Sequence, residues 1–161
     1  MIAILLPGLI LISAVGSGLI AGVFFAFSSF VMQALGRLPA EQGIAAMQSI
    51  NITVLNPLFL GSFMGTAVLC LVLIAAALFR WHEPQMICVI AGGALYVVGT
   101  VLVTMVFNVP LNESLADISP ASAEGAALWS RYLTSWTMWN HLRTGCAALA
   151  AVALTAGLLW N

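Results

Sequence analysis

Long stretches without charge constrain this chain more than any other feature of its sequence. The four stretches that contain no acidic or basic side chain are residues 1–36, 42–79, 84–112 and 144–161. A helix that crosses a bilayer needs about 20 mainly apolar residues, and each stretch supplies all or most of one. The membrane is therefore the expected solvent for most of the fold.

Four segments meet the requirements of a transmembrane helix. They are predicted at about Ile4–Leu35, Pro57–Phe79, Met86–Phe107 and Trp136–Trp160. The first is longer than a bilayer needs, so we expect it to tilt or project beyond the lipid, and its lack of a basic start argues against a cleaved signal peptide. The sequence predicts one all-α domain over residues 1–161, an integral membrane four-helix bundle with short interfacial helices in the first and third connections.

The composition supports this fold class and excludes several functions. Of the 161 residues, 63% are hydrophobic and 6% are charged, whereas soluble chains average about 25% charged residues. The basic residues are four arginines, too few to neutralise a run of phosphates, so no nucleic acid partner is expected. The cysteines lie in apolar runs without a C-x-x-C pair, which argues against a vicinal thiol redox centre.

Local chemistry predicts where the spans begin and end. Asn56 before Pro57 is a capping residue followed by a favoured first helical residue, so the second span should begin there. Pro110 lacks an N–H, so the third span should end near Asn108. A further short helix is expected in the third connection, after Pro120.

Pairs of glycines spaced four residues apart are predicted at contacts between spans. These pairs are Gly18 with Gly22 and Gly61 with Gly65. An even number of spans places both chain termini on the same side of the membrane. The few arginines leave the orientation undecided under the positive-inside rule, and the oligomeric state, including a homo-oligomer, also stays open.

Polar side chains are concentrated at the end of the bundle that carries the first and third connections. This polar end is predicted to contain the amides Gln48, Asn51, Asn56, Asn108, Asn112 and Asn140, together with Trp136, Trp139, His141 and Arg143. The opposite end offers only the short segment 80–85. This asymmetry is the main functional signal of the sequence, because ionisable groups near the membrane interior are expensive and mark functional sites.

One face of the fourth span carries much of this signal. Trp136, Trp139, Asn140 and Arg143 are spaced so that they share a helical face, and His141 lies about 100° round from Asn140. If that face turns inward, it forms a pocket wall of aromatic, amide and guanidinium groups. The alternatives are interfacial belt residues for the tryptophans, snorkelling for the arginine, and helix caps for the asparagines.

The residue inventory limits the chemistry of such a pocket. His82 and His141 lie at opposite membrane faces, which argues against a bis-histidine haem, and no Glu-x-x-His motif supports a di-iron bundle. A single copper or iron at His141 with Glu113 and Asp117 stays open, but we predict no metal or other cofactor. The remaining expectation is a mostly apolar pocket for a hydrophobic small molecule or a membrane lipid.

Four sequence runs resemble the anthrone-oxygenase-like family of small four-span membrane proteins. The runs are Phe24–Met32, Met47–Asn51, Asn108–Asn112 (N-V-P-L-N) and Trp136–Arg143, which contains W-N-H-x-R. The likeness extends from about Gly16 to the last span. It implies a multi-pass protein of a bacterial inner membrane and the O₂-dependent oxidation of an anthrone, or a quinol-like aromatic, without an organic cofactor.

Two hypotheses follow for the polar end. In the first, the protein is an oxygenase in which His141 is the base and Arg143 and Asn140 stabilise the oxyanion. The substrate-binding residues would be Gln48, Asn51, Asn108, Asn112, Trp136 and Trp139. In the second, the same residues hold a lipid, a quinone or a partner subunit without chemistry.

Overall fold

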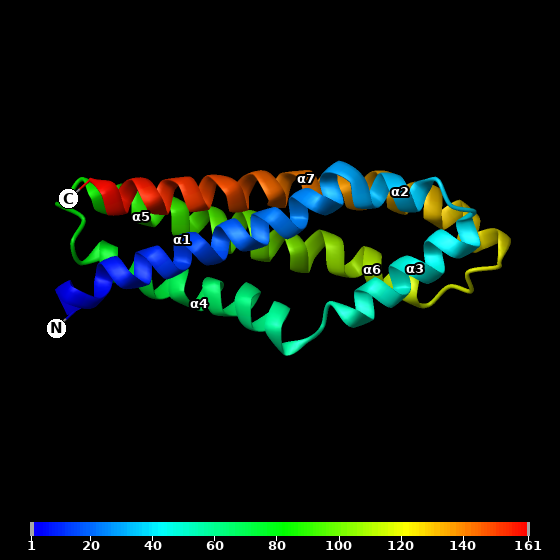
Figure 1. Cartoon of the computed structure of the whole chain (residues 1–161), viewed down its shortest axis with the longest axis horizontal. Helices are drawn as coiled ribbons and strands as arrows, with labels where there is room; N and C mark the ends of the chain where they lie inside the picture. Colours follow the sequence, from blue (N-terminus) through cyan, green and yellow to red (C-terminus); the bar gives the residue numbers. More distant parts are fainter. Residues whose placement is uncertain (1, 161) are drawn as a thin grey trace.

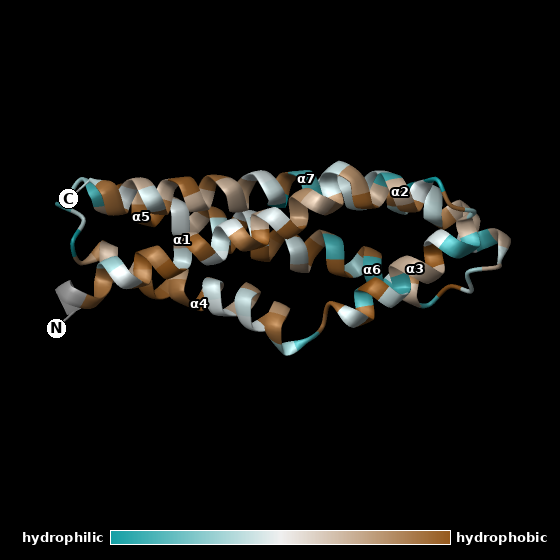
Figure 2. Ribbon diagram, viewed as in Figure 1, coloured by the Kyte–Doolittle hydropathy of each residue, from teal (hydrophilic) through white to brown (hydrophobic). Residues whose placement is uncertain are grey.

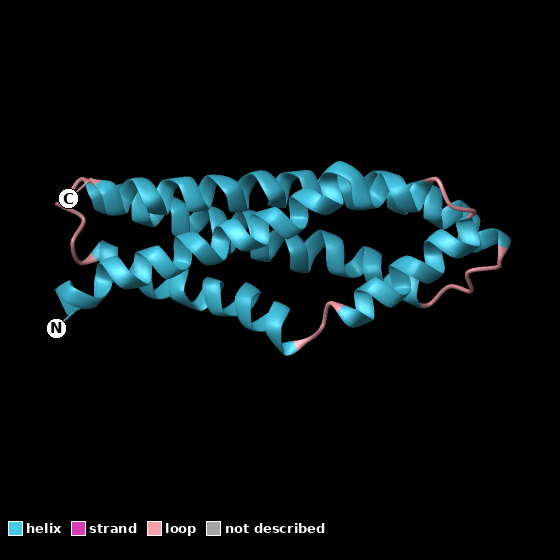
Figure 3. Cartoon of the chain, viewed as in Figure 1, coloured by secondary structure: helices cyan, strands magenta, loops and turns pink. Residues whose placement is uncertain are grey.

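The computed structural model describes the backbone of residues 2–160 and the side chains of residues 5–160, and within these bounds the fold is all-α. Four helices are long and apolar enough to cross a membrane: Leu5–Gly36, Pro57–Leu78, Gln85–Ala116 and Ala123–Leu159. The predicted four-span, multi-pass membrane fold is therefore confirmed by length and composition. Figure 3 shows that helix accounts for nearly all of the described chain.

Two of the spans contain π-helical segments. The first span consists of α1 (Ile2–Ala26), the π-helical turn η1 (Phe27–Val31) and α2 (Met32–Gly36). The third span consists of α5 (Gln85–Ala94), η2 (Leu95–Leu102), η3 (Thr104–Asn108) and α6 (Val109–Ala116), of which η2 and η3 are π-helical. The other helices are α3 (Ala40–Thr53), α4 (Pro57–Leu78) and α7 (Ala123–Leu159). π-Helical segments are rare in proteins, and those that occur are often at functional sites.

The helices pack around α7. Helix α1 runs along α7, α5 and η2 cover its other side, and α4 packs against α1 and α5. The start of α1, the end of α7 and the α4–α5 turn lie at one end of the bundle, while α3 and α6 lie at the other (Figure 1). This arrangement places the first and third connections together, as the sequence predicted.

Because the spans differ in length, part of the molecule extends beyond one end of α4, the second span. Helix α4 has 22 residues, or about 33 Å at 1.5 Å per residue, close to the hydrocarbon thickness of about 30 Å. Helix α7 has 37 residues, or about 55 Å. The part of the bundle beyond α4, made of α2, α3, α6 and the first turns of α7, is called the head below.

The predicted start of the second span is confirmed, but the predicted end of the third span and the predicted start of the fourth span need correction. Asn56 caps α4 by accepting a hydrogen bond from the Phe59 N–H at 3.0 Å. The third span does not end near Asn108, because Pro110 lies in the first turn of α6, where a missing N–H breaks no helical hydrogen bond. The helix expected after Pro120 forms the first turns of α7, so the fourth span begins at Ala123 and not at residue 136.

Two apolar cores lie one above the other along the bundle. The membrane core joins α1, α4, α5, η2 and α7, and it includes Ile10, Phe24, Phe63, Val89, Tyr96 and Leu154. The head core consists of Met32, Leu35, Ile44, Met47, Leu115, Trp129, Tyr132 and Trp136. Burying each large apolar side chain of the head core away from water contributes about 1.5–3 kcal/mol. The membrane core is held mainly by close packing, because lipid is as apolar as the side chains. Buried polar side chains lie where the two cores meet.

The outer surface of the spans is apolar, as expected for contact with lipid. Large exposed side chains include Leu11, Val15, Leu19, Val68, Leu71, Val72, Leu149 and Val152. Hydrophilic residues gather at the head and in the turns (Figure 2).

The predicted glycine contacts are wrong for three of the four positions. A Cβ added at Gly22, Gly61 or Gly65 would meet open space, and one at Gly18 would make only an ordinary contact with Ala151 at 3.9 Å. Close approaches occur at other glycines, among them Gly92, where a Cβ would lie 2.8 Å from Leu154 Cγ. Lipid-facing glycines and contact glycines have the same spacing in the sequence, so spacing alone does not distinguish them.

Candidate functional site

Asn140 and Arg143 turn inward from α7 at the boundary between the two cores. Asn140 is 0% exposed and Arg143 is 5% exposed. His141 is exposed on the outer side of the helix. The reason is helical geometry, since residues three apart share a face whereas the next residue is rotated by about 100°. His141 therefore lies on a different face of α7 from Asn140 and Arg143.

Hydrogen bonds of Asn140 and Arg143 connect three spans. The Arg143 Nε donates to Asn140 Oδ1 at 2.8 Å, and its Nη1 donates to Thr104 Oγ1 at 3.3 Å. The Asn140 Nδ2 donates to the Phe24 carbonyl and to Ser28 Oγ, both at 2.7 Å. The amide thus fixes the guanidinium inside the bundle and ties α7 to α1 and η1.

Two aromatic rings lie against the guanidinium. Arg143 Cζ is 3.9 Å from the centroid of the Phe24 ring and 4.7 Å from that of Trp136. Such cation–π contacts contribute about 0.5–2 kcal/mol each, more when they are desolvated. The rings therefore offset part of the cost of burying the charge and leave the edge of the guanidinium for hydrogen bonding.

The buried charge of Arg143 has no acidic partner among residues 5–160. The ion pair found in this part of the chain joins Arg80 to Glu83 at the opposite end of the bundle. A buried charge without a partner is costly, so this position favours the binding of an anion or of a group that becomes negative during a reaction.

A second group of polar residues lies next to Arg143, on the side of the head. Asn112 Oδ1 accepts hydrogen bonds from the Tyr132 hydroxyl and from Trp136 Nε1, both at 2.8 Å. Asn108 Nδ2 donates to the Trp136 carbonyl at 3.2 Å. Asn108 Oδ1 and Asn51 Nδ2 are buried without a hydrogen-bond partner in the described chain. The structure thus brings Asn108 and Asn112 together at Trp136.

Other residues predicted for the site lie apart from Arg143. Gln48 donates to the carbonyls of Leu115 and Ile118 at 2.8 and 3.0 Å, so its amide closes the end of α6. Trp139 is half-buried and stacks on Phe107, with 3.6 Å between ring centroids. These contacts give both residues a packing role, and neither makes a hydrogen bond to Arg143 or Asn140.

The side chains proposed for a metal do not come together. His141, Glu113 and Asp117 are all exposed. Within the described residues, no group of three or more His, Cys, Asp or Glu side chains is close enough to share an ion. The residues present therefore do not fit a metal site built on His141.

Sequence reasoning missed the hydroxyl and aromatic partners of the cluster. Phe24, Ser28 and Thr104 contact Arg143 or Asn140, and the Thr100 hydroxyl reaches the Arg143 carbonyl at 3.4 Å. A search for hydroxyl residues at the same depth as Arg143 in the other spans would have found Ser28 and Thr104. The π-helical turns that present them have no comparable sequence signature.

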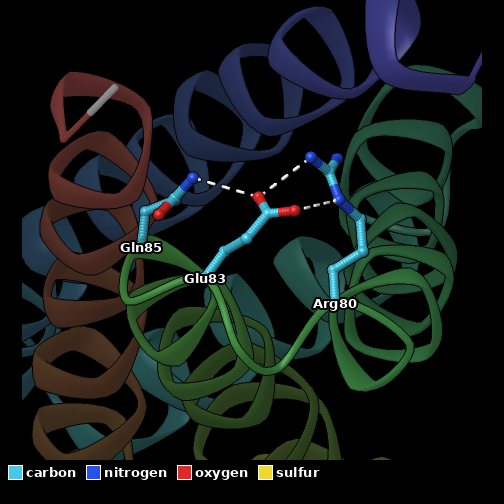
Figure 4. Close-up of polar contacts among 3 residues, drawn as sticks. All are labelled: Arg80, Glu83 and Gln85. Atoms are coloured by element: carbon cyan, nitrogen blue, oxygen red, sulfur yellow. Dashed lines mark hydrogen bonds and ion pairs between the residues drawn. The ribbon is translucent and has the colours of Figure 1, made fainter.

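The polar residues at the opposite end satisfy one another. Arg80 Nε and Nη2 donate to the two carboxylate oxygens of Glu83 at 2.7 and 2.9 Å, and Gln85 Nε2 donates to Glu83 Oε2 at 3.1 Å (Figure 4). Side chains of this pair are about a third exposed (36% and 34%). The charges at this end are balanced locally, in contrast to that of Arg143.

Four membrane-length helices around a buried arginine define the class, a multi-pass membrane protein with a polar centre inside the bundle. The sequence profile described as anthrone oxygenase matches residues 59–153. This is more than half of the chain, which therefore belongs to the anthrone oxygenase family. Family membership points to an oxygenase-type function.

The family match covers part of the expected likeness. It includes N-V-P-L-N and W-N-H-x-R, and with them Asn108, Asn140 and Arg143, but not the runs Phe24–Met32 and Met47–Asn51. Neither a curated protein nor a solved structure matches the chain.

Proposed function

We propose that the protein oxidises a flat, hydrophobic anthrone-type or quinol-type substrate with O₂ in the layer around Arg143. The observation that carries this proposal is the buried guanidinium, which lies between two aromatic rings and lacks an acidic partner in the described chain. It lies within the segment that matches the anthrone oxygenase profile.

The chemistry of an anthrone fits a buried cation. Removing a proton from the carbon opposite the carbonyl gives an enolate whose negative charge rests on oxygen. An arginine has five N–H donors, of which two bond Asn140 and Thr104. Donors placed where charge develops in a low-dielectric site are typically worth about 10²–10³ in rate each. The remaining N–H groups of Arg143 would stabilise the enolate oxygen.

The reaction is balanced without an external reductant. The enolate gives its electrons to O₂, a C–O bond forms at the deprotonated carbon, and the O–O bond then breaks. Anthrone and one O₂ yield anthraquinone and one water. The side chain of His141 faces outward, so the proton removed in the first step passes to water. The positive charge of Arg143 makes this proton easier to remove, because it stabilises the enolate.

Asn140 acts on the substrate through Arg143. Its Oδ1 holds the guanidinium Nε, and its Nδ2 is anchored on Phe24 and Ser28. The charge therefore does not need to reorganise when the enolate forms, which is the condition for strong electrostatic catalysis.

Turnover by purified protein tests this function. Protein in mild detergent should accelerate O₂ uptake and anthraquinone formation in equal amounts above the spontaneous rate. With ¹⁸O₂, one labelled atom should appear in the new quinone carbonyl and the other in water. No acceleration with anthrones or quinols, together with a lipid or quinone that stays bound and unchanged, would favour the non-catalytic binding module. Stoichiometric copper or iron in active protein would overturn the metal-free form of the proposal.

A further inference from the structure

The side chain of Asn108 contains a buried acceptor that nothing in residues 5–160 satisfies. Asn108 lies on η3 and is 0% exposed. Its Nδ2 donates to the Trp136 carbonyl at 3.2 Å, and its Oδ1 has no partner. The carbonyl of Trp136 fixes this orientation, because the flipped amide would place two acceptor oxygens against each other.

Unpaired acceptors of this kind are uncommon in folded proteins. Nearly all buried polar groups make a hydrogen bond to protein, ordered water or a ligand, because a buried polar group without a hydrogen bond costs free energy. Replacing the amide with an apolar side chain would remove that cost. The buried Oδ1 therefore indicates a hydrogen-bond donor supplied from outside the chain.

Asn108 lies one helical turn after Thr104, the residue that contacts the guanidinium of Arg143. Thr104, which accepts from Arg143 Nη1, precedes Asn108 by four residues on η3. Side chains at this spacing are neighbours on a helix, about 5–6 Å apart at Cβ. Trp136 joins the two groups, because its ring lies against Arg143 and its carbonyl bonds Asn108. A ligand that contacts both groups would therefore lie beside Trp136.

We infer that Asn108 is a specificity-determining residue whose Oδ1 accepts a hydrogen bond from a hydroxyl group of the ligand. The favoured ligand is a flat aromatic ketone that places an oxygen on Arg143 and carries a separate hydroxyl on Asn108. This inference rests on the proposed function for the aromatic ketone. One N–H of the Asn108 amide bonds the Trp136 carbonyl, and the unpaired oxygen makes Asn108 an acceptor for the ligand.

The expected consequence is discrimination against ligands that lack the donor. Sites built to hydrogen-bond a ligand hydroxyl reject analogues without it, because the buried protein group is then left unpaired. A methyl ether has the same oxygen but cannot donate. Because it is also one methyl group larger, the hydrogen bond is identified by how the alcohol-to-ether ratio changes when Asn108 is replaced.

The binding of three anthraquinones to the protein tests the inference without requiring turnover. The probes are 2-(hydroxymethyl)anthraquinone, its methyl ether and unsubstituted anthraquinone, and the readout is quenching of tryptophan fluorescence in detergent-purified protein. Wild-type protein should bind the alcohol about 10- to 100-fold more tightly than the ether. In Asn108→Leu this ratio should fall to about one, while affinity for unsubstituted anthraquinone stays within about threefold.

Two further variants keep the test decisive. Ser13→Ala removes another buried, unpaired polar atom, which lies eleven residues before Phe24 on α1, so it should retain the wild-type ratio. If Asn108→Leu does not fold, Asn108→Ala is measured in its place. A wild-type ratio near one, an unchanged ratio in the Asn108 variants, or no binding of any of the three quinones overturns the inference.

The two proposals fail separately. A protein that discriminates between alcohol and ether but does not oxidise anthrones refutes the proposed function and leaves the Asn108 subsite in place. A protein that oxidises anthrones with a ratio near one refutes the subsite alone.

Discussion

Replacing Arg143 with methionine should abolish most of the activity and leave the fold nearly as stable as before. The methionine keeps an unbranched side chain of similar reach but removes the charge. Arg143→Lys keeps the charge but loses the planar group that lies between Phe24 and Trp136. The two variants therefore separate the effect of charge from that of shape.

The magnitudes follow from the contacts of the guanidinium. The methionine variant loses two charge-assisted hydrogen bonds of about 1.5–3 kcal/mol each and two cation–π contacts of about 0.5–2 kcal/mol each. It gains by no longer burying an unpaired charge, an effect of several kcal/mol. These contributions are of similar size, so the free energy of unfolding should change by no more than about 2 kcal/mol. The barrier to enolate formation should rise by about 2.7–4 kcal/mol, a loss of about 10²–10³ in kcat.

The assay combines initial rates of anthraquinone formation with thermal melting in detergent. Arg131→Met is the matched control, because Arg131 is exposed on the same helix and should leave both measurements unchanged. Arg143→Lys should fall between wild type and Arg143→Met in kcat. The reasoning is refuted if Arg143→Met melts so early that the loss of activity follows the folded fraction, or if it folds and retains the wild-type rate.

Three further predictions concern residues near to and far from Arg143. His141→Ala should keep kcat/KM within about threefold of wild type because its side chain faces outward, and a 100-fold loss would restore His141 as the base. Ser13→Ala should raise the free energy of unfolding by about 1 kcal/mol, since its buried hydroxyl has no partner in the described chain. Thermal melting beside the control Ser62→Ala, whose half-buried hydroxyl bonds the Leu58 carbonyl, checks this, and a lower melting temperature contradicts it. Gly92→Val should destabilise the fold by about 1–3 kcal/mol because a Cβ there meets Leu154, whereas Gly61→Val enters open space; equal melting temperatures for the two variants would show that α5 and α7 can move apart.

The positions of the spans could be predicted because they depend on local composition. Charge gaps locate the four helices, and the Asn56 cap follows from side-chain chemistry next to the backbone. The end of the third span could not be predicted in this way. A proline at the start of a helical segment and a proline that ends a helix look alike in sequence, and the distinction at Pro110 depends on how the preceding π-helical turn is packed.

The inward face of α7 was partly visible in the sequence. Trp136, Asn140 and Arg143 share that face by spacing, and all three are buried. Spacing does not say how far the buried face extends round the helix, so it could not show that His141 is exposed and that Trp139 is only half-buried. Partners from other spans, such as Ser28 and Thr104, depend on the packing of the bundle, which no local pattern encodes.

The short length of α4 has a consequence for the membrane around this protein. Helix α4 covers a hydrocarbon layer of about one bilayer, whereas α7 continues well past it. Changing the acyl chain length of the lipid would therefore affect α4 and its connection to α3, whereas α7 is long enough to span the hydrocarbon layer at any of these thicknesses. A change in lipid thickness therefore acts mainly on α4. The length of α7, which carries Arg143, protects the polar centre from hydrophobic mismatch.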